Sequence, residues 1–232
     1  SRAADGPFQQ QIGAIAGILA QSATGFGSGP VKQFPRPWKK ALTDYAKEAQ
    51  PRVACNLDPI RCLLAARDGQ SMFRVMRALR RVFGPFPKWK NLFAMPEDAR
   101  AQRYHLASIM ITVPFELGKT YGELAKDPAV QRMWDRYCET PEGVPRERWQ
   151  RDAAAARAIL ASKRMAGIPV KIYGEVQLLL ESYVKIRDEI HAAYEFLRAA
   201  SEAALHEEMV LSSGNYTPAA DADGVYNAAY EG

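Results

Sequence analysis

The apolar residues of segment 71–83 recur at helical spacing, and this pattern restricts the fold more than any other feature of the sequence. At about 100° per residue, one face of a helix would collect the apolar side chains, namely Met72, Val75, Met76, Leu79, Val82 and Phe83. Arg74, Arg77 and Arg81 fall together on the opposite face. Gly84 and Pro85 then end the helix. The segment therefore predicts an amphipathic helix with one face on a core.

Comparable patterns predict helices over most of the remaining chain, at 97–113, 116–126, 127–138, 146–166, 170–186 and 188–208. Asp127 followed by Pro128 is typical of a helix start, and Gly167 is typical of a helix end. No segment shows an alternation of apolar and polar residues that clearly predicts a strand. Because the linkers are short, neighbouring helices are expected to pack as antiparallel hairpins. The expected fold class is all-α.

Residues 154–199 resemble the pentatricopeptide-repeat family. The matching features are residues 165–169 at the end of one helix, Tyr173, Leu179, Leu180 and 183–185 in the next, and Ala192, Ala193, Phe196 and Leu197 in the third. A weaker echo lies at 104–109, about two repeat periods earlier. The resemblance implies a right-handed solenoid, in which Leu179 and Tyr183 would bury against the following helix at Ile190, Tyr194 and Leu197.

Members of that family are usually organellar and usually read single-stranded RNA, one base per repeat. The residue after the repeat's tyrosine should then offer a hydrogen-bonding side chain to a base. Here that residue is Gly174, which has no side chain to offer. This departure argues against base-specific reading and leaves the solenoid as a packing scaffold.

The chain is expected to have an N-terminal extension at 1–56, a helical-repeat domain at 57–208 and an extended tail at 209–232. Segment 22–37 is rich in Gly and Pro, and the tail is polar. Such ends are ordered only when something holds them, so a large partner is expected to contact them. The first residue is Ser1, which suggests either a removed targeting segment or a chain that was shortened at its start. Together with the resemblance, this points to the mitochondrial matrix.

Charge is spread unevenly along the chain. Residues 61–103 hold ten basic and three acidic residues, whereas 201–232 hold six acidic residues and neither Lys nor Arg. The basic segment suggests an anionic partner. Arg74, Arg77 and Arg81 form the candidate interaction face, which could hold phosphates or pair with carboxylates of a neighbouring subunit. With no aromatic residue identified on that face, a protein partner is favoured over RNA.

Catalytic chemistry finds little support in the sequence. Cys55, Cys62 and Cys138 lack C-x-x-C spacing. The glycines of 25–32 imitate a phosphate-binding loop but lack its Gly-Lys-Ser/Thr ending, so a linker is expected there. His191 and Glu195 share a helix face, yet two such residues cannot make a zinc site alone. No catalytic, cofactor-binding or metal-binding residue is therefore predicted.

Two functions remain open on this reasoning. The first is a non-catalytic accessory subunit of a large mitochondrial assembly, such as an F1-associated subunit of ATP synthase, bound through its solenoid surface and both termini. The second is an RNA-binding pentatricopeptide protein of a mitochondrial ribosome or an RNA-processing complex. In both cases the chain is expected to have no enzymatic activity of its own. The longest apolar run, at 12–20, is too short to span a bilayer.

Overall fold

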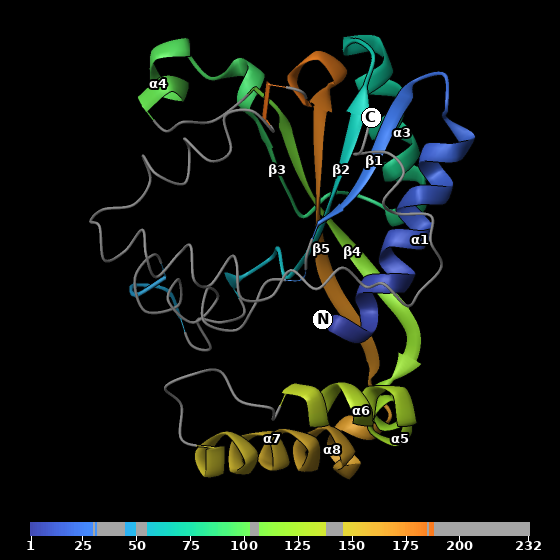
Figure 1. Ribbon diagram of the computed structural model, residues 1–232, viewed down its shortest axis with the longest axis vertical. Coiled ribbons are helices and arrows are strands. Elements are labelled where there is room, and N and C mark those ends of the chain that lie inside the picture. The colour runs from blue at the N-terminus through green and yellow to red at the C-terminus, as the bar shows by residue number, and fades with distance from the viewer. Residues whose placement is uncertain are drawn as a thin grey trace. The chain divides into compact units, whose positions relative to one another are not determined.

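The computed structural model describes residues 1–29, 31, 45–49, 55–102, 107–137, 146–184 and 186–187. The chain divides into two units, Ser1–Val184 and Lys185–Gly232. Every helix and strand named below belongs to the first unit and is labelled in Figure 1 where there is room.

The first unit is built on a mixed sheet of five strands. The strands are β1 (Ala23–Gly29), β2 (Ile60–Ala66), β3 (Lys88–Asn91), β4 (Ile109–Thr120) and β5 (Pro169–Leu180). Their spatial order is β1-β2-β5-β4-β3. Strands β2 and β5 run parallel, and the other neighbours run antiparallel. The expected all-α solenoid is therefore wrong, and with it the resemblance to pentatricopeptide repeats.

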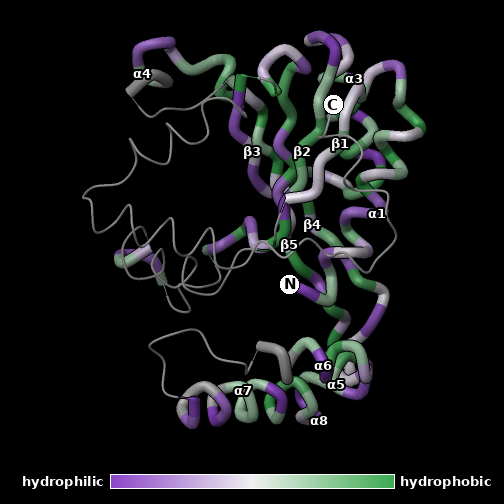
Figure 2. The backbone as a smooth tube through the Cα atoms, viewed as in Figure 1, coloured by the Kyte–Doolittle hydropathy of each residue, from purple (hydrophilic) through white to green (hydrophobic). Residues whose placement is uncertain are grey.

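Two helices cover one face of this sheet. Helix α1 (Arg2–Ile18) and helix α3 (Gly69–Phe83) both contact β1, β2 and β4, and Figure 1 shows them beside β1 and β2. Their apolar side chains join the strands in one core, whose fully buried members include Phe8, Ile12, Val75, Leu79, Ile60, Leu64, Ile111, Val113, Val176 and Leu178. Figure 2 shows this concentration of hydrophobic residues along β2 and β4. Burial of this apolar surface is the main force that holds the two layers together.

Gly174 of β5 lies against the Phe8 ring of α1. A Cβ atom there would lie 2.7 Å from the ring of Phe8, and that ring is fully buried and packs edge-to-face on Phe115 with centroids 5.6 Å apart. The missing side chain at position 174 thus has a packing reason. The resemblance had made position 174 a base-reading position, and this packing shows that the glycine there has a different role.

Helix α3 confirms the helix predicted over 71–83. The Asp68 carboxylate caps its first turn by accepting a hydrogen bond from the Ser71 backbone N–H at 2.7 Å. Gly84 ends it at φ 78°, a conformation that glycine adopts without strain. The predicted apolar stripe is buried except for Met76, which is half-buried, and Val82, which is 47% exposed.

A second group of helices lies between β4 and β5 in the chain. It comprises α5 (Tyr121–Lys126), α6 (Pro128–Tyr137), α7 (Arg146–Ala161) and α8 (Lys163–Ala166), and a 3-10 turn (Leu92–Ala94) and α4 (Glu97–Gln102) precede β4. Thr120 and Glu123 form a reciprocal capping box at the start of α5. The helix predicted over 127–138 is confirmed, as is most of the one predicted over 146–166, which is broken at Ser162. No described helix is long and apolar enough to cross a membrane.

The helix predicted over 170–186 is wrong, because residues up to Leu180 form strand β5. The helix predicted over 97–113 holds only for α4 at its start, and from Ile109 onward the range is strand β4. Ile172, Val176 and Leu180 are four residues apart, a spacing that fits one face of a helix and equally one face of a strand. Leu178 and Leu179 are both buried although they point to opposite faces of the sheet. A strand buried on both faces loses the alternation that would identify it.

Several predictions concern residues beyond those described. The helix expected over 188–208 and the partners of Leu179 at Ile190, Tyr194 and Leu197 lie there, as does the tail at 209–232. The burial of Leu179 is confirmed at 2% exposure, but on a strand. Within the predicted N-terminal extension, residues 2–18 and 23–29 form α1 and β1.

Candidate functional site on the second face of the sheet

The sheet has a second face, opposite the one that α1 and α3 cover. Successive residues of a strand point to alternate faces, and the core takes the even-numbered residues of β2 and β5, such as Cys62 and Val176. The odd-numbered residues of those strands point to the second face. Directly paired residues of neighbouring strands share a face, so the strand register identifies which residues of β1, β4 and β3 join them.

The register places four polar side chains in one row on the second face. Arg61 of β2 pairs with Glu175 of β5, Glu175 pairs with Thr112 of β4, and Thr112 pairs with Lys88 of β3. At the other end, Arg61 pairs with Gly29 of β1. With strands about 4.8 Å apart, this polar row brings together residues that are distant in sequence.

Glu175 is the only carboxylate in the polar row, and it is half-buried. Its Oε1 atom accepts a hydrogen bond from Nε2 of Gln177 at 2.8 Å. Gln177 is two residues along the same strand and therefore points to the same face. This amide fixes the direction of the carboxylate on the sheet.

Basic side chains stand on both sides of Glu175. Arg61 lies on the neighbouring strand β2, and Lys88 lies on the edge strand β3. Lys90 follows on β3 and points to the second face as well, opposite Met110. Both lysines are exposed, so their ammonium groups can reach an anion above the sheet.

The residues of β1 that pair with second-face residues of β2 from position 25 onward are glycines, so β1 contributes only backbone atoms there. Gly25, Gly27 and Gly29 of β1 pair with the second-face residues of β2. A Cβ atom at Gly29 would lie 2.7 Å from Cγ of Arg61 and 3.0 Å from its carbonyl oxygen. The glycine therefore leaves the room that the Arg61 side chain occupies. This segment was expected to be a linker, and it is strand β1 instead.

Tyr173 adds an aromatic ring to this face. It lies two residues before Glu175 on β5, opposite Pro114 of β4, and its side chain is 36% exposed. A ring in this position can stack on a planar ligand group. Around the polar row, the second face thus brings together one carboxylate, three basic side chains and a ring, and the Glu116–Lys171 ion pair lies farther along β4 and β5 on the same face.

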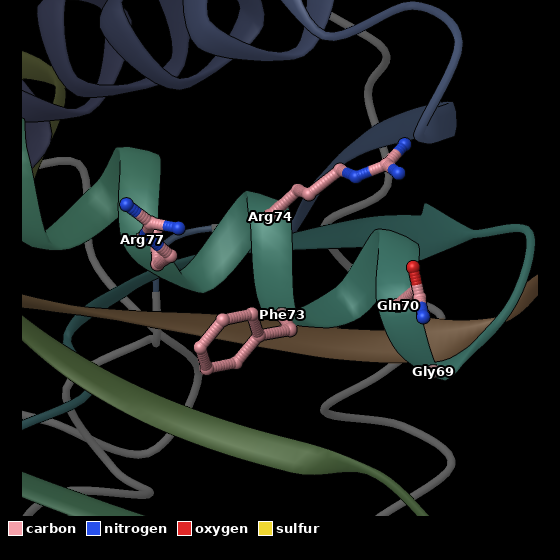
Figure 3. Close-up of a pocket in the computed structure, with 5 residues that line it drawn as sticks. All are labelled: Gly69, Gln70, Phe73, Arg74 and Arg77. Carbon is pink, nitrogen blue, oxygen red and sulfur yellow. The ribbon is translucent and has the colours of Figure 1, made fainter.

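The predicted interaction face lies elsewhere. Arg74, Arg77 and Arg81 are exposed on α3, which covers the core face. Arg74 and Arg77 line a hollow that also includes Gly69, Gln70 and Phe73 (Figure 3). The structure adds an aromatic residue that the sequence reasoning had missed on this face, because Phe73 is 61% exposed and the Arg77 guanidinium lies 5.9 Å from its ring centre.

The other sequence candidates do not join the polar row. Cys62 is buried in the core, where burial and then the charge of Glu175 raise the pKa of its thiol, so it is unsuited to act as a thiolate nucleophile. Cys138, His191 and Glu195 lie outside the described residues. Among those described, no group of three His, Cys, Asp or Glu side chains could hold a metal ion.

The polar row was missed because segment 170–186 was expected to be a helix. One signal was present: in 171–178, the residues Ile172, Gly174, Val176 and Leu178 alternate with Lys171, Tyr173, Glu175 and Gln177. That alternation predicts a strand with one apolar and one polar face. It would have placed Tyr173, Glu175 and Gln177 together.

Comparisons with known proteins give no family assignment. No family model matches the sequence, and no curated protein matches it. Among solved structures, two of small alarmone synthetase 1 from Bacillus subtilis, one of them bound to its product pppGpp, resemble this chain at 13% identity. The likeness covers 92% of each chain, with TM-scores of 0.46 and 0.45. A likeness of this degree assigns neither a fold family nor an activity.

The functions expected from the sequence are nevertheless wrong. An accessory subunit of ATP synthase and an RNA-binding pentatricopeptide protein both required a helical solenoid, and the five-stranded sheet excludes one. The expected absence of enzymatic activity had a different basis, the lack of a recognisable catalytic motif in the sequence, and the polar row removes that basis because its members come together only in the sheet.

Proposed function

We propose that the second face of the sheet is the active site of an enzyme that transfers a phosphorus-containing group between a nucleotide and a hydroxyl acceptor. The polar row carries this proposal, because it sets Glu175 between Arg61 and Lys88 on one face of the sheet. A carboxylate flanked by cations suits chemistry in which a proton leaves a hydroxyl while negative charge develops on phosphate oxygens.

The basic residues serve to bind phosphates. Guanidinium and ammonium groups make charge-assisted hydrogen bonds with phosphate oxygens, and these bonds are about twice as strong as neutral ones. Lys88 and Lys90 are exposed on the edge strand, so a polyphosphate can approach from solvent. Arg61 lies on the far side of Glu175 and would hold the group being transferred or its acceptor.

Glu175 is the proposed general base. Gln177 holds its Oε1 atom, which orients the second oxygen to accept a proton from the attacking hydroxyl. A positioned base contributes about 100- to 10,000-fold to the rate. Tyr173 would stack on the nucleobase, because its partly exposed ring lies on the same face two residues away.

The test compares the wild-type protein with Glu175→Gln. Each protein is incubated with ATP, GTP, both together, or pppGpp, in the presence of Mg²⁺, and the nucleotides are followed by phosphorus NMR. The wild type is expected to convert at least one of them, and Glu175→Gln to be at least about 100-fold slower while still binding nucleotide.

The matched control is Glu116→Gln. Glu116 is an exposed carboxylate on β4 that pairs with Lys171 at 3.2 Å, so its loss should leave the rate unchanged. Conversion by Glu175→Gln at the wild-type rate, or no nucleotide binding by the wild type, would overturn the proposal.

A further inference from the structure

A second surface, on α3 and β3, has the chemistry of a polyanion-binding site. We define the arginine face as Phe73, Arg74, Arg77, Arg80 and Arg81 of α3 together with Trp89 of β3. Trp89 pairs with Ile111, a core-face residue of β4, so it lies on the α3 side of the sheet. The arginine face and the proposed active site are therefore on opposite sides.

The charge of this surface is all of one sign. Residues 69–91 contain no Asp or Glu, and all four arginines of the arginine face are exposed. Within the described part of the chain, none of the four forms an ion pair. Asp68, which caps α3, is an acidic group that interacts electrostatically with Arg74. The remaining clustered positive charge attracts an anionic ligand.

An aromatic ring lies at each end of the group of four arginines. Phe73 is 61% exposed and Trp89 is 54% exposed. Phe73 lines the hollow with Arg74 and Arg77 (Figure 3), and Trp89 lines a second hollow with Arg80, Pro85 and Phe86. Each hollow pairs a ring with at least one guanidinium. Large exposed rings are costly to leave in water and mark interaction sites when they cluster.

The spacing of these groups suits a chain of nucleotides. Phe73 and Arg80 are seven residues apart on one side of the helix, a separation of about 10 Å at 1.5 Å per residue. This distance is about three steps of a nucleic-acid strand at 3.4 Å per nucleotide. Phosphates would contact the arginines while unpaired bases stack on the rings.

We propose that the arginine face binds single-stranded nucleic acid without sequence preference. The observation that distinguishes this occupant from an acidic protein is the pairing of each ring with an arginine, because bases supply flat π faces next to phosphates and carboxylate side chains do not. A double helix hides its bases inside the stack and would use the arginines alone.

The experiment measures binding of a fluorescein-labelled 20-nucleotide oligouridylate to the full chain by anisotropy. Affinity should fall with salt, and the slope of log K against log salt should be about −3 for four phosphate contacts. Phe73→Ala should weaken binding about 5- to 150-fold, because a stacked base contributes about 1–3 kcal/mol. Arg77→Gln should weaken binding and make the slope shallower by about 0.7.

Matched controls use equally exposed residues on other helices. Ile159→Ala on α7 removes an apolar side chain that is 60% exposed, and Arg164→Gln on α8 removes an exposed arginine; both should bind as the wild type does. Glu175→Gln should also bind normally, which separates this surface from the proposed active site.

Three results with nucleic acid, and a fourth with lipid vesicles, would overturn the proposal. One is no oligouridylate binding at 50 mM salt. Another is an affinity that neither Phe73→Ala nor Arg77→Gln changes. The third is a 20-base-pair duplex that binds as tightly as the oligouridylate and loses the same affinity when Phe73 is replaced by Ala. Vesicles of phosphatidylserine and phosphatidylcholine are a further arm, and tighter binding to them than to the oligonucleotide would contradict the proposal in favour of a lipid surface.

Discussion

At the scale of single residues, glycines shape both layers of this protein. Gly174 lets the Phe8 ring of α1 lie against β5, and Gly29 leaves room for Arg61 on the opposite face. These two positions differ in what they permit, since the first serves core packing and the second serves the polar row. Sequence alone shows only that a side chain is missing, and it gives no information about which neighbour fills the space.

Gly174→Ala is expected to destabilise the protein. The added methyl group would lie 2.7 Å from the Phe8 ring, which is fully buried and cannot move away freely. Overpacking of this kind costs about 1–3 kcal/mol, measured as the free energy of unfolding in urea. Gly167→Ala is the control, because nothing lies within 4 Å of a Cβ atom there. Equal stability of both variants would contradict the described packing of α1.

At the scale of elements, local signals predicted the helices and missed the strands. Helix α3 has an apolar stripe, a capping Asp and a terminal Gly that all agree, so it could be predicted well. Strands β4 and β5 lack such end signals, and the spacing of four in β5 fits either structure. Pairing with distant strands decides between helix and strand, and the local sequence does not show which segments pair.

The cap of α3 provides a pH-dependent test. The Ser71 backbone N–H lowers the pKa of the Asp68 carboxyl from its ordinary value of 3.8. Because the pKa is lower in the folded state, the ionised cap stabilises the fold above about pH 4, and this stabilisation is lost as pH falls through the folded-state pKa. Asp68→Asn keeps a capping oxygen without the charge.

We therefore expect Asp68→Asn to be less stable than the wild type at pH 7. The difference should shrink toward zero as the pH falls below about 3.8. Urea unfolding at a series of pH values measures it. A difference that stays constant from pH 7 to pH 3 would show that the charge of Asp68 does not stabilise α3.

At the scale of the whole molecule, the sheet order creates the candidate active site. Strand β5 enters between β2 and β4, which come much earlier in the chain, and this insertion places Glu175 between Arg61 and Thr112. The exposed arginines of α3 could be identified from the sequence, since helical spacing is local. The polar row could not, because its members meet only through long-range pairing.

The most direct test of the account is a methyl NMR titration with a nucleoside triphosphate. The chain has seven methionines, and labelling their methyl groups gives a simple spectrum. Met110 lies on the second face beside Gln177, whereas Met76 lies on α3. We predict that a nucleoside triphosphate shifts the Met110 signal and leaves the Met76 signal in place. A shift of Met76 without a shift of Met110 would contradict the placement of the active site on the second face of the sheet.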